Sequence, residues 1–178
     1  MIGSKLSYEL KRQLIHCLIF SKLDYCNGLL YGLPDFLMKK LQKVQNACVR
    51  FLFGRKVIKK WARITPFLKK AHFLPIRERI NYKIALTAFK CLNNLAPEYL
   101  TKCVAMKSPS VHALRKDDDY FILNVPPTPK YCRTERSFSH CGPLVWNTLP
   151  YDLRTETDIK VFKNRLKTYL FREAYEST

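Results

Sequence analysis

Apolar residues recur along the chain at the 3.6-residue period of an α-helix, and this pattern predicts a mainly helical fold. Long helices are expected over residues 35–53, from Pro75 through Leu92, and from Asp158 toward the C-terminus. Gly54 follows the first of these as a stop signal, because glycine readily takes the left-handed conformation that ends a helix. A shorter N-terminal pattern places apolar residues on one helix side, namely Leu6, Leu10, Leu14, Cys17 and Leu18.

The helix expected over residues 35–53 has two different faces. Its apolar stripe, which we expect to pack in the core, consists of Leu37, Leu41, Val44, Cys48 and Phe51. Cations and amides gather on the opposite side, namely Lys39, Gln42, Lys43, Asn46 and Arg50. This arrangement predicts a helix that packs through one side and offers the other to a charged partner.

The chain changes character near residues 101–118. A basic helical region is expected over residues 1–100, a linker or loop over 101–118, and a smaller α+β extension over 119–178 that ends in an amphipathic helix. Residues 120–125 are aromatic and β-branched, which predicts a short β element. The prolines that follow prevent it from continuing as a central strand.

Charge indicates what kind of partner the basic region binds. The 178 residues include 32 Lys and Arg against 14 Asp and Glu, a net charge of +18. Residues 39–90 hold 15 of the basic side chains and a single acid, Glu78. Such a concentration attracts polyanions, nucleic acid first and anionic membranes second, although a merely solvated basic surface is the plain alternative.

The candidate nucleic-acid contacts are the cations of this region with one amide and one indole. They are Lys39, Lys43, Asn46, Arg50, Arg55, Lys56, Lys59, Lys60, Trp61, Arg63, Arg79, Lys83 and Lys90. Lysine supplies point charge toward phosphates and arginine binds them in a bidentate manner. Trp61 has two equal interpretations, a ring that stacks on a base and a ring that packs as a lid.

Cysteine content indicates a reducing compartment. The seven cysteines are odd in number and scattered, which disfavours a secreted disulfide framework. The longest apolar stretch near the N-terminus is too short to cross a bilayer. We therefore expect a soluble intracellular protein, nuclear or cytoplasmic, with no membrane partner. Zinc is disfavoured, because Cys103, Cys132, His140 and Cys141 lack the usual Cys-x-x-Cys pair, and no metal or other cofactor is expected.

Several ordered stretches of the chain resemble one family. They are SKLDYCNGLLYGLP (21–34), LQKVQNA (41–47), HFLPIRERI (72–80), KCLNNLAPEYL (90–100), RSF (136–138), WNTLP (146–150) and FKNRLK (162–167). In this order and spacing they resemble the C-terminal part of LINE-type, jockey-like non-LTR retrotransposon reverse transcriptases. The resemblance covers nearly the whole chain.

The resemblance implies a chain that begins after the polymerase palm, with a thumb-like bundle followed by the extension beyond it. In the parent polyprotein the thumb holds the template–primer duplex, so RNA, DNA or an RNA–DNA hybrid is the implied ligand. The upstream polymerase region is a further implied partner.

Catalytic chemistry is missing from the sequence. A polymerase needs carboxylates on a strand–turn–strand to hold two metal ions. The acidic cluster Asp117-Asp118-Asp119 follows no apolar strand and is better explained as a solvated loop. We find no other nucleophile or phosphate-loop motif, so the chain is not expected to be an enzyme on its own.

The leading hypothesis is therefore a non-catalytic, nucleic-acid-binding fragment of a reverse transcriptase. One alternative is a relict open reading frame without an independent role, which would expose apolar surface and aggregate. Another is a protein-interaction module that docks through its aromatic, proline-rich second half.

Overall fold

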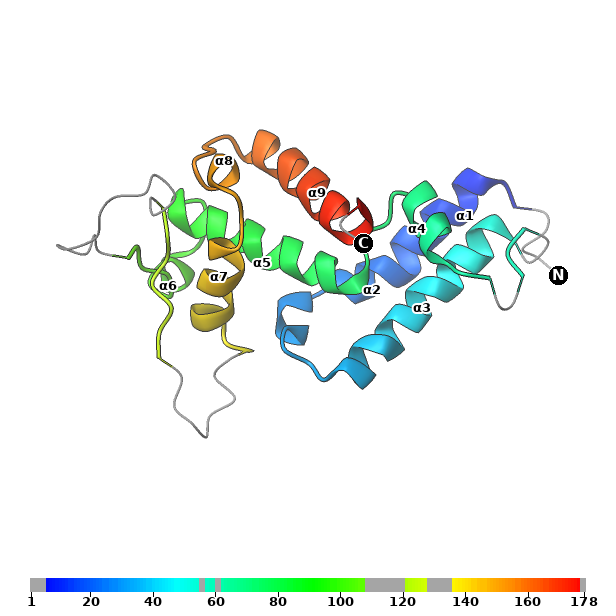
Figure 1. Cartoon of the computed structure of the whole chain (residues 1–178), viewed down its shortest axis with the longest axis horizontal. Coiled ribbons are helices and arrows are strands. Elements are labelled where there is room, and N and C mark those ends of the chain that lie inside the picture. Colours follow the sequence, from blue (N-terminus) through cyan, green and yellow to red (C-terminus); the bar gives the residue numbers. More distant parts are fainter. Residues whose placement is uncertain (1–5, 55–56, 60–61, 108–120, 128–135, 177–178) are drawn as a thin grey trace. The chain divides into compact units, whose positions relative to one another are not determined.

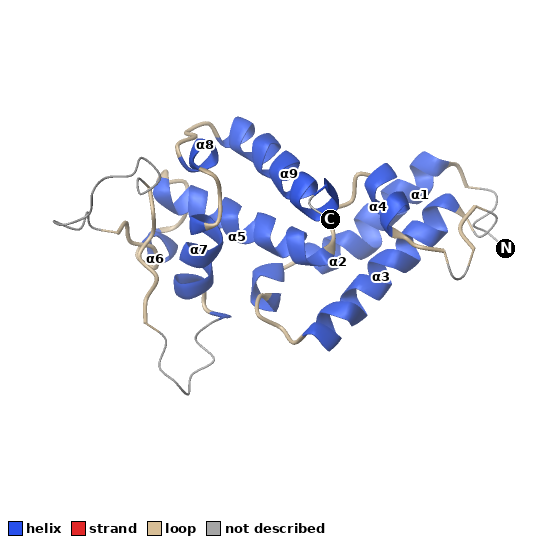
Figure 2. Ribbon diagram, in the orientation of Figure 1, coloured by secondary structure: helices blue, strands red, loops and turns tan. Residues whose placement is uncertain are grey.

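A computed structural model describes residues 6–54, 57–59, 62–107, 121–127 and 136–176. Over these residues the fold is mainly α-helical, which confirms the predicted class (Figures 1 and 2). The helices are α1 (Tyr8–Leu14), a π-helix (Ile15–Phe20), α2 (Ser21–Asp24), a 3-10 turn (Asn27–Leu30), α3 (Asp35–Phe53), α4 (Thr65–Lys70), α5 (Ile76–Leu92), α6 (Glu98–Thr101), α7 (Phe138–Asn147), α8 (Tyr151–Arg154) and α9 (Ile159–Glu176).

The three long helices begin and end where local sequence signals predict. Helix α3 ends before Gly54, which has a positive φ of 83°. Helix α5 starts directly after Pro75. Helix α9 starts after Asp158, whose carboxylate accepts hydrogen bonds from the backbone N–H groups of Lys160 and Val161. These boundaries follow from capping chemistry, which needs only neighbouring residues.

Contacts divide the chain into two compact units. The first comprises Met1–Asn27, Leu33–Arg79 and Phe171–Thr178, and the second comprises Gly28–Gly32 and Ile80–Leu170. Helices α5 and α9 each contribute residues to both units. The contacts thus group the chain differently from the sequence division at residues 101–118.

The core of the first unit is centred on Phe20, Val49 and Phe73, which are at most 2% exposed. The rings of Phe20 and Phe73 meet edge to face at 4.8 Å. Ile15 and Phe20 both reach this core, because the wider turn of a π-helix brings residues five positions apart onto one side.

The predicted N-terminal apolar face is wrong. Leu10, Leu14 and Leu18 are 49%, 40% and 61% exposed, and Cys17 is exposed as well. Helix α1 buries none of its residues, and the segment reaches the core through Ile15 and Phe20 of the π-helix instead.

Helix α3 buries a different side from the one that its apolar pattern predicts. Its buried residues are Met38, Gln45, Cys48, Val49 and Leu52. Of the predicted stripe only Cys48 is buried, whereas Val44 and Phe51 are 44% and 41% exposed. The buried side is rotated by roughly a quarter of a turn from the predicted stripe.

Two glutamine side chains explain this rotation. The fully buried amide of Gln45 donates to the carbonyl oxygen of Leu74 at 2.8 Å. The side-chain oxygen of Gln42 accepts from the backbone N–H of Ile76 at 3.0 Å. These bonds satisfy backbone groups at the start of α5 that would otherwise be buried without partners, so the amides take positions that apolar side chains would normally fill.

The second unit has an aromatic core built by α5, α7 and α9. Phe89 of α5 stacks on Phe162 of α9 with ring centroids 4.2 Å apart. Trp146 of α7 lies 5.9 Å from Phe162, and all three side chains are at most 1% exposed. Leu166 and Leu170 extend this buried side of α9, as the sequence pattern predicts.

The short β element predicted near residues 120–125 does not form a strand among the described residues. Leu123 makes an isolated antiparallel bridge with Met106. The Asn147 side chain of α7 occupies both backbone groups of Leu123, with bonds of 2.9 Å each. The indole of Trp146 also donates to the Phe121 carbonyl at 2.8 Å. Helix side chains thus satisfy the hydrogen-bonding groups that a neighbouring strand would need.

Candidate nucleic-acid interface

The cationic stripe of α3 is the main candidate surface in the first unit. Lys39, Lys43 and Arg50 recur at helical spacing along about 16 Å of helix. Lys39 and Lys43 are exposed, Arg50 is half-buried, and neither lysine forms an ion pair with a described residue. Asp35, the acid at the start of the helix, is instead paired with Arg77 at 2.7 Å.

The amides of this stripe have a structural role. Gln42 donates to the side-chain oxygens of Gln45 and Asn46 at 2.9 and 3.0 Å. Gln42 therefore does not face a ligand as its position among the cations predicts. Asn46 is half-buried at the edge of the stripe, with its oxygen already occupied by Gln42.

The segment after α3 contributes two further exposed cations. Lys59 and Arg63 are exposed, whereas their sequence neighbours Ile58 and Ile64 are buried. The remaining candidates of this segment, Arg55, Lys56, Lys60 and Trp61, lie outside the described residues. Each of these two exposed cations is thus adjacent in sequence to a buried isoleucine.

Arg79 is a structural residue and does not join the cationic surface as the sequence predicts. Its guanidinium binds both carboxylate oxygens of Asp24, with Nε at 2.9 Å from Oδ1. It also lies over the ring of Phe20, 4.3 Å from the centroid. A guanidinium whose donors are already used in this way has few left for phosphate.

Lys83 and Lys90, the other candidates on α5, belong to the second unit. Lys83 is exposed and Lys90 is half-buried. They lie in a different unit from the α3 stripe and therefore form a separate group of candidates.

One basic helix face escaped the candidate list. On α9, Lys160, Lys163 and Lys167 share a side at helical spacing, with Asn164 next to them. The first fourteen residues of this helix, 159–172, contain five cations and no acid. The spacing that singled out α3 could have found this face, but the lower net charge of the second half of the chain obscured it.

The charge of each unit shows that both are basic. The first unit carries 18 Lys and Arg against 6 Asp and Glu, and the second carries 14 against 8. The positive field is therefore strongest on the first unit, but it is not confined to it.

The thiols, imidazoles and carboxylates form no metal-binding cluster in the described part of the chain. No group of three His, Cys, Asp or Glu side chains there could hold a metal ion. Cys132 and the acids Asp117, Asp118 and Asp119 lie outside the described residues. Burial raises the pKa of the Cys141 thiol to about 11, so this thiol is a poor nucleophile at neutral pH. Among the described helices, none has the length and apolar character to cross a membrane.

Comparison with known proteins gives no match. No family model, no curated protein and no solved structure matches this chain.

Proposed function

We propose that this chain is a non-catalytic nucleic-acid-binding module, equivalent to the C-terminal region of a LINE-type reverse transcriptase. It binds RNA, DNA or an RNA–DNA hybrid through phosphate contacts that do not depend on sequence. The observation that carries the proposal is the α3 stripe, where Lys39 and Lys43 are exposed and have no ion pair with a described residue.

Helix physics supports a ligand for this stripe. Lysines four positions apart on a helix repel each other. A surface that served only solubility would gain by mixing acids among these cations, as in the pair Glu98–Lys102 of α6 at 2.8 Å. Phosphates would relieve the repulsion and release bound counterions.

The test is a titration of the full chain with a labelled RNA–DNA hybrid at several salt concentrations. Affinity should fall steeply with salt, and Lys39→Gln with Lys43→Gln should make the slope of log K against log[salt] shallower by about 1.4–1.8, the value for two lost phosphate contacts.

The matched control is Lys69→Gln with Lys102→Gln. It removes the same charge from lysines that already pair with Glu176 and Glu98, at 3.8 and 2.8 Å. No binding at low salt, or binding without salt dependence, would contradict the proposal. An equal effect of both double variants would contradict the assignment to α3.

A second proposal concerns the upstream polymerase region as a protein partner. The exposed leucines of the N-terminal segment, Leu10, Leu14 and Leu18, favour it, because apolar side chains gathered on one surface favour protein contact. Substituting all three leucines with serine should keep the chain folded and reduce its binding to a separately produced upstream polymerase region in gel filtration. Unchanged binding to that region would argue against an apolar docking surface there.

A further inference from the structure

Helix α9 is divided lengthwise into a buried apolar side and a charged outer side. Phe162, Leu166 and Leu170 are at most 5% exposed. Lys160 and Lys167 are exposed, whereas Lys163 is half-buried at the margin. At 100° per residue the three lysines fall within about a sixth of a turn and span about 10 Å along the helix.

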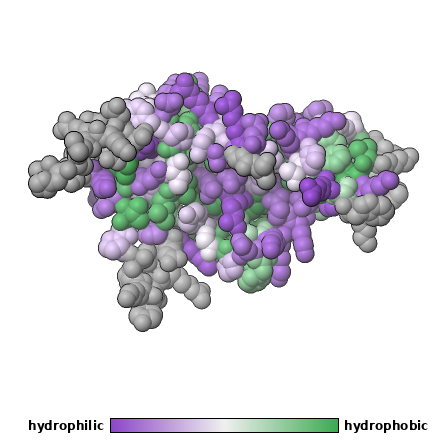
Figure 3. Space-filling view, in the orientation of Figure 1, coloured by the Kyte–Doolittle hydropathy of each residue, from purple (hydrophilic) through white to green (hydrophobic). Residues whose placement is uncertain are grey.

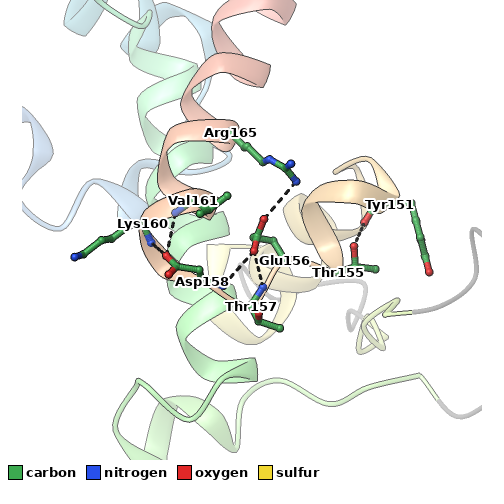
Figure 4. Close-up of polar contacts among 8 residues, drawn as sticks. All are labelled: Tyr151, Thr155, Glu156, Thr157, Asp158, Lys160, Val161 and Arg165. Carbon is green, nitrogen blue, oxygen red and sulfur yellow. Dashed lines mark hydrogen bonds and ion pairs between the residues drawn. The ribbon is translucent and has the colours of Figure 1, made fainter.

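The acids closest in sequence to this face are already engaged (Figure 4). The Glu156 carboxylate accepts from the backbone N–H groups of Thr157 and Asp158 at 3.1 and 3.2 Å and from the Arg165 guanidinium at 3.3 Å. Asp158 caps the helix, and its bonds to the Val161 and Lys160 N–H groups lower its pKa. Both carboxylates are thus committed to the helix start.

Lys163 and Lys167 are left without compensation. Neither forms an ion pair with a described residue, and they lie four positions apart on one side of the helix. Lys160 lies beside the Asp158 carboxylate, which partly balances its charge. The Asn164 side chain is exposed next to these lysines and makes no hydrogen bond to a described residue.

We propose that Lys163 and Lys167, flanked by Lys160 and Asn164, form a second phosphate-binding face for nucleic acid in the second unit. This proposal depends on the proposed function only for the class of ligand, which is nucleic acid. It does not depend on the α3 stripe, because the residues of the α9 face belong to a different unit. A linear row of cations about 10 Å long can contact more than one phosphate of a nucleic-acid strand.

A membrane surface fits this face less well than nucleic acid. Helices that bind membranes insert an apolar side into the lipid headgroup region. The apolar side of α9 is occupied in the core, where Phe162 stacks on Phe89. The outer side is polar, and Figure 3 shows hydrophilic colouring over α9. Lipid could therefore be held by charge alone, without insertion.

The experiment uses the full chain with a labelled RNA–DNA hybrid and four double or quadruple variants. These are Lys163→Gln with Lys167→Gln, Lys39→Gln with Lys43→Gln, all four together, and the ion-paired control Lys69→Gln with Lys102→Gln. We expect the α9 pair to weaken binding about tenfold at low salt and to make the salt slope shallower by about 1.4–1.8. The quadruple variant should add both losses. A fifth variant, Lys163→Arg with Lys167→Arg, should bind like the wild type because it keeps the charge.

Each outcome decides between the two proposals. If the α9 pair behaves like the ion-paired control while the α3 pair loses affinity, the α9 face is wrong and the proposed function stands. If the α9 pair loses affinity and the α3 pair does not, the α9 face is supported and the α3 assignment is wrong. If the wild-type protein does not bind the hybrid, or binds phosphatidylserine vesicles instead, both the proposed function and the α9 face are overturned.

Discussion

Helices α3 and α9 are almost equal in length, 19 and 18 residues, and carry similar rows of lysines, yet they are held in place differently. Helix α9 packs through aromatic and aliphatic side chains, with Phe162 fully buried. Helix α3 buries the amide of Gln45 and leaves Val44 largely exposed. The comparison shows that a cationic face can be supported by apolar side chains alone, as in α9, or by apolar side chains that surround a buried amide, as in α3.

This difference also explains why the apolar pattern of α9 predicts its buried side well and the apolar pattern of α3 does not. The apolar period identifies the side that prefers to leave water. It gives no sign of an amide that is buried because a backbone group far away in the chain needs a hydrogen-bond partner. In α9 the side that buries apolar residues is the side that the apolar pattern predicts. In α3 the need to pair distant backbone groups turns the buried side away from the apolar stripe.

The largest effect should come from the apolar side of α9. Phe162→Ala removes the ring that stacks on Phe89 at 4.2 Å and leaves a cavity, so it should lower the free energy of unfolding by about 3–5 kcal/mol. Urea denaturation followed by Trp146 fluorescence measures this, in a Trp61→Phe background that leaves Trp146 as the single remaining tryptophan of the sequence. The control Val161→Ala, at a 40% exposed neighbour, should change stability by less than about 0.5 kcal/mol.

The next effect tests the amide network of α3. Gln45→Leu increases the apolar content of the helix but leaves the Leu74 carbonyl without its donor, so it should cost about 1–3 kcal/mol. Val44→Gln, at an exposed neighbour, should cost less than about 0.5 kcal/mol. The apolar-stripe interpretation of α3 predicts the reverse order. Urea denaturation of both variants, with hydrogen exchange at the Ile76 amide, distinguishes the two interpretations.

Local signals account for the parts of the fold that the sequence predicts. Gly54 and Asp158 mark helix ends through their own backbone and side-chain chemistry. The parts that could not be predicted depend on partners far away in the chain. Gln45 bonds to a carbonyl 29 residues away. The Asn147 side chain forms hydrogen bonds with both backbone groups of Leu123, 24 residues away.

The candidate site follows the same division. The exposure of Lys39 and Lys43 follows from spacing alone, and it was predicted correctly. Arg79 has the same charge and a similar spacing, but Asp24 lies 55 residues away and removes it from the surface. Single-sequence reasoning therefore finds cations readily but does not find the acids that neutralise them.

A smaller effect distinguishes the starts of the two helices. Pro34 precedes α3 and makes no side-chain cap, whereas Asp158 caps α9. Because the folded pKa of Asp158 is lowered, its contribution is present above the unfolded value and is lost as pH falls below about 4. Asp158→Ala should speed hydrogen exchange at the Val161 amide at neutral pH. Asp158→Asn should keep the cap and lose this pH dependence, and an unchanged pH profile in Asp158→Asn would contradict the assignment.

The smallest effect asks whether the two lysine rows are equivalent. Removing a like-charge pair from a helix face should stabilise it, so Lys39→Gln with Lys43→Gln and Lys163→Gln with Lys167→Gln should each raise stability by about 0.2–0.5 kcal/mol without ligand. With an RNA–DNA hybrid present the order should reverse, because a ligand that binds the folded state stabilises the tighter binder more. Thermal unfolding of each variant with and without the hybrid measures both signs. One double variant can be more stable than the wild type without the hybrid and still be stabilised by the hybrid as much as the wild type is. The lysine row changed in that variant is then only a solvated face. In that case the two helices differ in function as well as in packing.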